Sequence, residues 1–310
     1  MIRVGVIRGG ASPQYYDVSL KSGEHILSHL RSDLMNREYW PLDIFISKDG
    51  VWHANGMPVT LDILKDKIDV IWNALHGDYG KNGQIQKLLE KYGIPYTGSD
   101  LQASFISHNK VLTKEKFAEL GINTPKHILL SAYLEDLDGP REEYIYKKAR
   151  EILELLPPPW IVKSLTGDSS MGIHVCRTFQ ELVRAFEIGV REKISILVEE
   201  MIEGRHASIS VIDNFRGEDT YPFLSSDNLS RDEKQKIESL AVKIHNGLDL
   251  NHYSQIHFII SPKKGVYAIE VDTLPELAED SQLGKHLQLV GSSMPEFIKH
   301  IINLAIYKTR

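Results

Sequence analysis

Residues 161–173, Ile-Val-Lys-Ser-Leu-Thr-Gly-Asp-Ser-Ser-Met-Gly-Ile, combine a short apolar strand, a lysine and a loop of small residues. Lys163 ends the apolar part, and Ser169, Ser170 and Gly172 follow it. A strand fixes the lysine, while small residues let backbone N–H groups and hydroxyls close over phosphate oxygens. The lysine precedes the loop, so this is not the G-x-x-x-x-G-K-[ST] pattern of a P-loop. The order favours a phosphate-binding segment, and a surface turn after an edge strand is the alternative.

The composition predicts a cytoplasmic, multi-domain α/β protein. The chain has 310 residues, which is longer than a typical domain with a single hydrophobic core. Of these residues, 42% are hydrophobic and 25% are charged, which is ordinary for a globular protein. Its formal net charge is −6, without the excess of basic residues that nucleic-acid binding requires, so we expect no nucleic-acid partner. Cys176 is the one cysteine, which excludes an internal disulfide and fits a reducing compartment. No stretch approaches the ~20 apolar residues that span a bilayer, and we expect no signal segment before the first strand.

The first part of the chain alternates strand and helix patterns, which predicts a domain with a parallel or mixed sheet. Its first strand ends in Gly9 and Gly10, as strands of α/β units commonly do. The stretch Ile94-Pro-Tyr-Thr-Gly-Ser99 marks the exit from this domain. The strands are predicted at 2–7, 40–47 and 68–75, and the helices at 17–30 and 83–92.

The rest of the chain mixes helices with strands and contains no repeat or low-complexity segment. One helix contains Lys110, and residues 131–156 are charged and helical in pattern. Further strands are predicted at 160–163, 194–199, 207–212, 255–260 and 266–271, and further helices at 231–246 and 295–307. We predict three modules in all, residues 1–104, 105–205 and 206–310.

A glycine-rich loop with a histidine, His76-Gly-Asp-Tyr-Gly-Lys-Asn-Gly83, follows the strand predicted at 68–75. Ligands of open α/β sheets bind at the carboxyl ends of strands, so this loop is a candidate binding segment. A turn whose histidine only hydrogen-bonds the backbone is the alternative. Elsewhere, Lys110 and Lys163 would clamp phosphates as point charges if the fold brings them together.

Carboxylates end two further apolar strands. Glu199 and Glu200 are suited to accept hydrogen bonds from an adenine amino group or ribose hydroxyls, although a solvated strand end has the same pattern. Glu270 and Asp272 lie two residues apart and therefore on one face of their strand. Two such carboxylates repel each other unless a cation lies between them, and oxygen ligands suit Mg²⁺ that carries nucleotide phosphates. His257 would face this pair if its strand pairs antiparallel with theirs, which completes a predicted metal site.

In this order, the motifs resemble those of the D-alanine–D-alanine ligase family of ATP-grasp carboxylate–amine ligases over nearly the whole chain. The segment 94–99 is especially characteristic. The other matching segments are 9–10, 17–20, 74–83, 103–104, 109–110, 113–114, 121–125, 162–172, 197–199 and 270–275. The resemblance implies an ATP-grasp fold of α/β (α+β) class with an N-terminal Rossmann-like domain built on a parallel sheet.

The resemblance also implies roles for individual residues. Catalytic roles fall to Ser19, His76 and Ser169. The amino-acid substrates would lie against His76, Gly77 and Ser281, and Glu270 and Asp272 would bind Mg²⁺. ATP would be bound by Lys110, Lys163, Ser169, Ser170, Gly172, Glu199, Glu200 and Ile202.

The reaction implied by the resemblance joins two amino acids at the expense of ATP. ATP phosphorylates the carboxylate of the first amino acid, and the amine of the second attacks the acylphosphate. Mg²⁺ and the lysines would neutralise the transferring phosphoryl group, and closure of the loop at 167–172 would exclude water. D-alanine is the expected substrate, in peptidoglycan precursor synthesis, and the resemblance allows a homodimer.

Several positions depart from the family pattern around the metal and the substrate. The family's Arg-x-Asp reads Gln255-Ile-His257 here, and the expected asparagine ligand is Asp272. The loop between 212 and 231 is too short for a full substrate-covering loop. Three further departures are Glu276 for a glycine, His206 for the acid that holds ribose, and a segment 12–17 without the glutamate that engages the first amine.

These departures leave three hypotheses. The first is a D-alanine–D-alanine ligase, and the second is an ATP-grasp ligase with another amino-acid or hydroxy-acid substrate, which the changed amine-binding segment favours. The third is a nucleotide-binding homologue that has lost catalysis, favoured by Gln255, His257 and Glu276. Loss of one transition-state donor typically costs ~10²–10³ in rate, so several losses together can abolish the family reaction unless Asp272 or His257 compensates for the missing residues.

Overall fold

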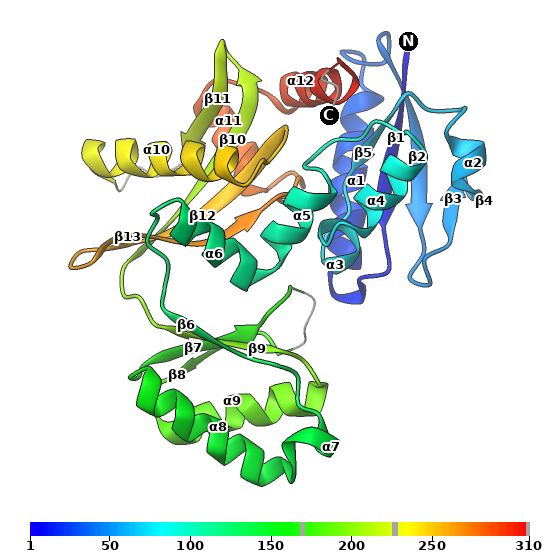
Figure 1. Ribbon diagram of the computed structural model, residues 1–310. Helices are drawn as coiled ribbons and strands as arrows, with labels where there is room; N and C mark the ends of the chain where they lie inside the picture. The colour runs from blue at the N-terminus through cyan, green and yellow to red at the C-terminus, as the bar shows by residue number, and fades with distance from the viewer. Residues whose placement is uncertain (168–170, 225–228, 308–310) are drawn as a thin grey trace. The chain divides into compact units, whose positions relative to one another are not determined.

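The computed structural model describes residues 1–167, 171–224 and 229–307. Backbone contacts divide the chain into two compact units (Figure 1). Unit 1 comprises Met1–His108, Ala207–His257 and Glu270–Arg310, and unit 2 comprises Asn109–His206 and Phe258–Ile269. The N-terminal and C-terminal segments thus share one unit, and the three modules expected from the sequence stay a prediction.

A five-stranded mixed sheet forms the N-terminal part of unit 1, which confirms the prediction of a parallel or mixed sheet. Its strand order is β4-β3-β2-β1-β5, with β1 parallel to both neighbours and β2 antiparallel to β3. The strands are β1 (Ile2–Gly9), β2 (Tyr39–Ile46), β3 (Trp52–Ala54), β4 (Met57–Pro58) and β5 (Val70–Asn73). The β3–β4 hairpin was not predicted, because strands of two or three residues are too short to show alternation.

Helices cover both faces of this sheet. On one face, α1 (Tyr16–Leu30) buries Ile26, Leu27 and Leu30 in a core that also contains residues of the C-terminal helix α12 (Met294–Tyr307). On the other face, α4 (Gln84–Lys91) contributes Ile85 and Leu89 to a second core. The other helical segments of this part are the 3₁₀ helix η1 (Pro13–Tyr15), α2 (Leu61–Leu64), α3 (Asp78–Lys81) and α5 (Leu101–His108).

The C-terminal part of the chain contributes a four-stranded sheet in the order β11-β10-β12-β13. Its strands are β10 (Arg205–Phe215), β11 (Glu218–Leu224), β12 (Tyr253–Ser261) and β13 (Gly265–Asp272), and its helices are α10 (Arg231–Gly247), α11 (Gln282–Leu289) and α12. The segment expected to be a short loop after residue 212 instead forms an antiparallel hairpin of β10 with β11. β11 lacks the alternation of apolar and polar residues that predicts a strand, because it contains charged residues and Pro222. The proline is tolerated because β11 is the edge strand of the sheet.

Unit 2 contains an antiparallel four-stranded sheet of order β6-β9-β7-β8. Helices α8 and α9 pack together, and a single core joins them to the sheet (Figure 1). The strands are β6 (His127–Leu130), β7 (Trp160–Ser164), β8 (Ile173–Cys176) and β9 (Ile196–Glu200), and the helices are α6 (Lys110–Glu119), α7 (Glu135–Asp138), α8 (Arg141–Leu155) and α9 (Phe179–Glu192). In the described parts of both units, none of the helices has the length and apolarity required to cross a membrane.

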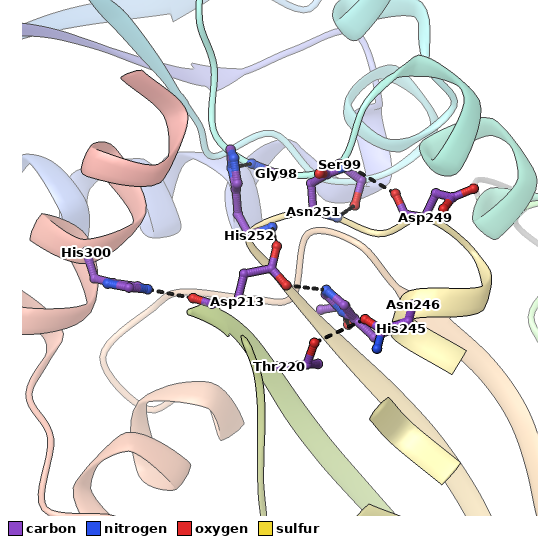
Figure 2. Close-up of polar contacts among 11 residues, drawn as sticks. Gly98, Ser99, Asp213, Thr220, His245, Asn246, Asp249, Asn251, His252 and His300 are labelled. Atoms are coloured by element: carbon purple, nitrogen blue, oxygen red, sulfur yellow. Dashed lines mark hydrogen bonds and ion pairs between the residues drawn. The ribbon is translucent and has the colours of Figure 1, made fainter. Parts of the chain in front are cut away.

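A buried polar network centred on Asp213 ties the C-terminal segments of unit 1 together (Figure 2). Asp213 is 5% exposed, and its carboxylate accepts the backbone N–H of His252 at 2.7 Å and lies 3.0 Å from Nε2 of His245. Its backbone oxygen accepts a hydrogen bond from Nε2 of His300 at 2.7 Å. The loop held in this way reaches the N-terminal domain, because the N–H of Gly98 donates to Nδ1 of His252 at 3.1 Å.

Replacing this carboxylate should destabilise unit 1. Asp213→Ala leaves the His252 N–H and the His245 ring without their buried acceptor, which typically costs about 3 kcal/mol. We expect urea unfolding of the full chain to show that loss. The exposed Asp219 is the matched control, and Asp219→Ala should change the stability by no more than about 0.5 kcal/mol. Equal effects of the two substitutions would contradict this role for Asp213.

Candidate active site

His76 follows β5 and is buried against helix α1. Its side chain is 4% exposed, and Nε2 lies 2.9 Å from Oγ of Ser22. The backbone N–H of His76 donates to Oγ of Ser19 at 2.8 Å. Burial, together with the nearby charge of Lys81, lowers the pKa of His76 to about 3, so the ring is neutral at pH 7. The structure therefore brings Ser19 and His76 together, two residues that the sequence assigned to the same site.

A lysine in the same loop forms an ion pair with one of the predicted metal ligands. Nζ of Lys81, the last residue of α3, lies 2.7 Å from Oδ1 of Asp272, and both side chains are largely buried. The same oxygen accepts the backbone N–H of Leu274 at 3.0 Å. Burial alone would raise the pKa of Asp272, but the charge and hydrogen bond of Lys81, together with His76 and the Leu274 N–H, place this pKa below its usual value. Asp272 is therefore an ionised carboxylate with an internal counter-charge.

The structure does not assemble the predicted metal set of Glu270, Asp272 and His257. In residues 1–167, 171–224 and 229–307, no group of three or more His, Cys, Asp or Glu side chains could hold a metal ion. Glu270 is exposed at the end of β13, and its carboxylate is the kind of oxygen ligand that Mg²⁺ prefers. Mg²⁺ commonly uses one or two carboxylates together with substrate phosphates and water, which Glu270 fits.

Ser281 lies at the start of α11 and has a structural contact of its own. It is 5% exposed, and its Oγ accepts the N–H of Gly284 at 3.2 Å, which caps the helix. The adjacent Gln282 accepts hydrogen bonds at Oε1 from Oγ of Ser208 and from Nε2 of Gln255, both at 3.2 Å. Gln255, in the place of the family's arginine, is thus part of a neutral network.

In unit 2, two lysines share one buried carboxylate. Nζ of Lys163 on β7 lies 3.0 Å from Oε2 of Glu199 on β9, and Nζ of Lys114 on α6 lies 3.0 Å from Oε1. Lys114 also donates to Oγ1 of Thr124 at 2.9 Å. The strand register explains the first pair, since Lys163 lies opposite Leu197 and Glu199 is its diagonal neighbour on the same face.

Glu199 is ionised despite its burial. Its exposed fraction is 3%, and removal from water raises its pKa. The charges and hydrogen bonds of Lys163 and Lys114 together more than offset this effect, so that the pKa of Glu199 lies below its usual value. Glu199 thus holds two ammonium groups at fixed positions in this buried cluster, an arrangement that suits an anionic ligand.

The other predicted nucleotide-binding residues of unit 2 lie on neighbouring elements. Lys110 opens α6, and its backbone N–H donates to the oxygen of Leu165 at 3.3 Å, directly after β7. Glu200 ends β9 and forms an ion pair with Lys264 at 3.2 Å. Ile202 is buried, and Gly172 has a φ of 68°, a conformation that favours glycine. Ser169 and Ser170 lie outside the described residues.

Three residues that contact candidate site residues were not predicted from the sequence. They are Lys114 at Glu199, Lys81 at Asp272 and Ser22 at His76. Lys114 and Lys81 do occur within the segments that carry the family resemblance. Their ion pairs depend on contacts over long sequence distances, which no local pattern reports. Ser22 follows Ser19 by three residues, and this spacing places both hydroxyls on one face of α1.

Comparison with known proteins identifies the family. Residues 55–99 match the D-ala D-ala ligase N-terminus, and residues 117–222 and 216–303 match the D-ala D-ala ligase C-terminus. The chain is 30% identical over 327 residues to the D-alanine–D-alanine ligase of Desulforamulus reducens, covering 98% of this chain and 99% of the relative.

Solved structures have the same fold. D-alanyl-alanine synthetase A from Vibrio cholerae superposes with a TM-score of 0.85 at 23% identity, covering 99% of each chain. The D-alanine–D-alanine ligase from Bacillus anthracis, complexed with ATP, gives a TM-score of 0.78 at 24% identity, covering 99% of this chain and 98% of that one. These likenesses define an ATP-grasp fold. The chain belongs to the D-alanine–D-alanine ligase family.

Removing the charge of Glu199 should destabilise unit 2 in a pH-dependent way. Glu199→Gln leaves two buried lysines without their counter-charge, which typically costs about 3 kcal/mol at pH 7. The folded-state pKa of Glu199 lies below its usual 4.5, so its carboxylate stabilises the fold fully above that pH and progressively less as the pH falls through the folded-state pKa. Denaturant unfolding between pH 3 and 7 should therefore show the two proteins converging at low pH.

The exposed Glu203 provides the matched control for this measurement. Glu203→Gln should leave the stability within about 0.5 kcal/mol of the unmodified protein at every pH. A Glu199→Gln protein as stable as this control at pH 7 would contradict the ionised, doubly paired state of Glu199.

Proposed function

We propose that this protein is an ATP-dependent ligase that joins two D-alanine molecules through an acylphosphate, in the synthesis of peptidoglycan precursors. The observation that carries the proposal is the buried cluster in which the Glu199 carboxylate holds the ammonium groups of Lys163 and Lys114, in a chain of this family. The name of the Desulforamulus reducens relative and the ATP complex of the Bacillus anthracis protein support the substrate and the nucleotide.

Lys163 and Lys110 would bind the phosphates of ATP. Glu199 holds the Lys163 ammonium in one orientation, so little side-chain ordering is needed when a phosphate binds. Lys110 opens a helix whose backbone is joined to the segment after β7, which couples its position to that of Lys163. The loop at 167–172 would close over the nucleotide. The adenine contact expected of Glu199 would fall to Glu200 and Ile202, because the Glu199 carboxylate is engaged by Lys163 and Lys114.

His76 would act in the substrate site as a neutral hydrogen-bonding group. Its low pKa keeps the ring neutral at pH 7, and its contacts with Ser22 and Ser19 fix the ring and the backbone. Gly77 has a φ of 73°, which lets the loop turn directly after His76. Ser281, at the start of α11, would bind the carboxylate of the second amino acid.

Mg²⁺ would be bound by Glu270 together with phosphate oxygens, and it would supply positive charge to the transferring phosphoryl group. Asp272 is engaged by Lys81, so it would contribute to the charge of the site without the free carboxylate expected of a ligand. The assignment of His257 to the metal, the homodimer and the cytoplasmic location stay predictions.

A ligase with a different amino-acid or hydroxy-acid substrate is the second candidate. The segment that replaces the amine-binding glutamate has its own fixed geometry, since Oγ of Ser12 accepts the N–H of Tyr79 at 3.0 Å. Gln255, in place of an arginine, also removes a positive charge from the substrate side. Both changes alter groups that would contact substrate and leave the lysine cluster of unit 2 intact.

An ADP-release assay with ATP, Mg²⁺ and a panel of D- and L-amino acids and hydroxy acids, with mass detection of products, tests the proposal. ADP together with D-alanyl-D-alanine is the expected result. ADP with a different product would establish the second candidate. ATP binding without turnover on any substrate would refute both and identify a homologue that has lost catalysis.

Lys163 gives a direct test of the phosphate-binding role. Lys163→Met should lower kcat/KM for ATP about 10²–10³-fold, because a cation aimed at the transferring phosphoryl group is removed. Lys126→Met is the control, since the Lys126 side chain is exposed and should leave the kinetics unchanged. Thermal unfolding of both variants would separate lost activity from lost structure, and unchanged kinetics in a folded Lys163→Met protein would refute the role.

A further inference from the structure

The ion pair between Lys81 and Asp272 joins two segments of unit 1 that lie 191 residues apart in the sequence. Lys81 ends α3, in the loop that follows His76, and Asp272 is the last residue of β13. The separation of Nζ from Oδ1 is 2.7 Å, and the two side chains are 20% and 25% exposed. A pair of this length and burial is a fixed part of the site, unlike a mobile surface contact.

The ion pair of Lys81 with Asp272 offsets part of the negative charge that β13 carries. Glu270 and Asp272 lie on the same face of the strand, where two carboxylates need a cation to offset their repulsion. Lys81 supplies one positive charge at Asp272. The Oδ1 atom that it contacts also accepts the Leu274 N–H, so this oxygen has two donors from the protein itself.

A divalent ion at Asp272 would have to compete with this arrangement. A metal bound by the same carboxylate would lie close to the Lys81 ammonium, and like charges at a few ångströms in a half-buried site repel strongly. Displacing Lys81 instead would leave a lysine without its counter-charge in a site of low exposure, which is costly as well.

We propose that Lys81 serves as a built-in cation at Asp272, so that Asp272 does not ligate a divalent metal in this protein and the metal is bound through Glu270 alone. The proposal rests on the proposed function, since it concerns the metal that accompanies ATP. It makes Lys81 a positioning residue, because its effect on the metal acts through Asp272.

Direct titration with Mn²⁺, followed by electron paramagnetic resonance of the free ion, measures this competition without any turnover. Lys81→Met in the full chain frees the Asp272 carboxylate, and we expect it to bind Mn²⁺ at least about tenfold more tightly than the unmodified protein. Lys81→Arg retains the positive charge and should resemble the unmodified protein. Lys87→Met, which removes an exposed lysine from α4, is the matched control and should show no gain.

A second variant keeps the test decisive even if Lys81→Met fails to fold. The double variant Lys81→Met/Asp272→Asn removes both charges of the pair at once, so it should leave Mn²⁺ affinity within about twofold of the unmodified protein. Weaker Mn²⁺ binding by this double variant would show that Asp272 is a ligand and overturn the proposal. An unchanged affinity in folded Lys81→Met, or an equal gain in Lys87→Met, would overturn it too.

The outcome is separable from that of the proposed function. Dipeptide formation by the unmodified protein tests the ligase assignment, whereas the Mn²⁺ titration tests the role of Lys81. A tenfold gain without any ligation would leave the role of Lys81 standing and refute the ligase. Dipeptide formation by the unmodified protein, with no gain in Mn²⁺ affinity in Lys81→Met, would support the ligase and refute the role of Lys81.

Discussion

The carboxylate of Asp213 is the contact on which the arrangement of unit 1 most depends. It accepts the backbone N–H of His252 and contacts the buried His245, and His252 in turn binds the N–H of Gly98. Ring contacts among Trp72, Tyr253 and Phe297 add apolar packing between the same parts of the chain. The N-terminal and C-terminal segments therefore share one core within unit 1, the unit that also contains His76 and Asp272.

Lysine–carboxylate pairs define the chemistry of both units. In unit 2, Glu199 holds the ammonium groups of two lysines, and this pair of lysines suits a phosphate. In unit 1, the single pair of Lys81 with Asp272 is balanced, and the exposed Glu270 beside it suits a cation. Because these groups are preorganised, little reorganisation is required when charge moves between ATP and a carboxylate.

Long periodic elements were predictable from the sequence, whereas short strands and distant contacts were not. The strands β1, β2 and β12 and the helices α1, α10 and α12 follow from apolar patterns of five or more residues. The edge strand β11 was missed because Pro222 and charged residues hide its alternation. The motifs located Lys163 and Glu199, but their pairing with Lys114, and that of Asp272 with Lys81, depends on the tertiary fold, which local spacing does not specify.

The most direct test of carboxylate activation uses D-alanine labelled with ¹⁸O in its carboxyl group. If ATP phosphorylates that carboxylate and an amine then displaces the phosphate, one labelled oxygen leaves with the phosphate. We predict inorganic phosphate that carries a single ¹⁸O, formed in step with the dipeptide. Phosphate without the label, released while ADP accumulates, would contradict an acylphosphate and reduce the protein to an ATPase of ATP-grasp fold.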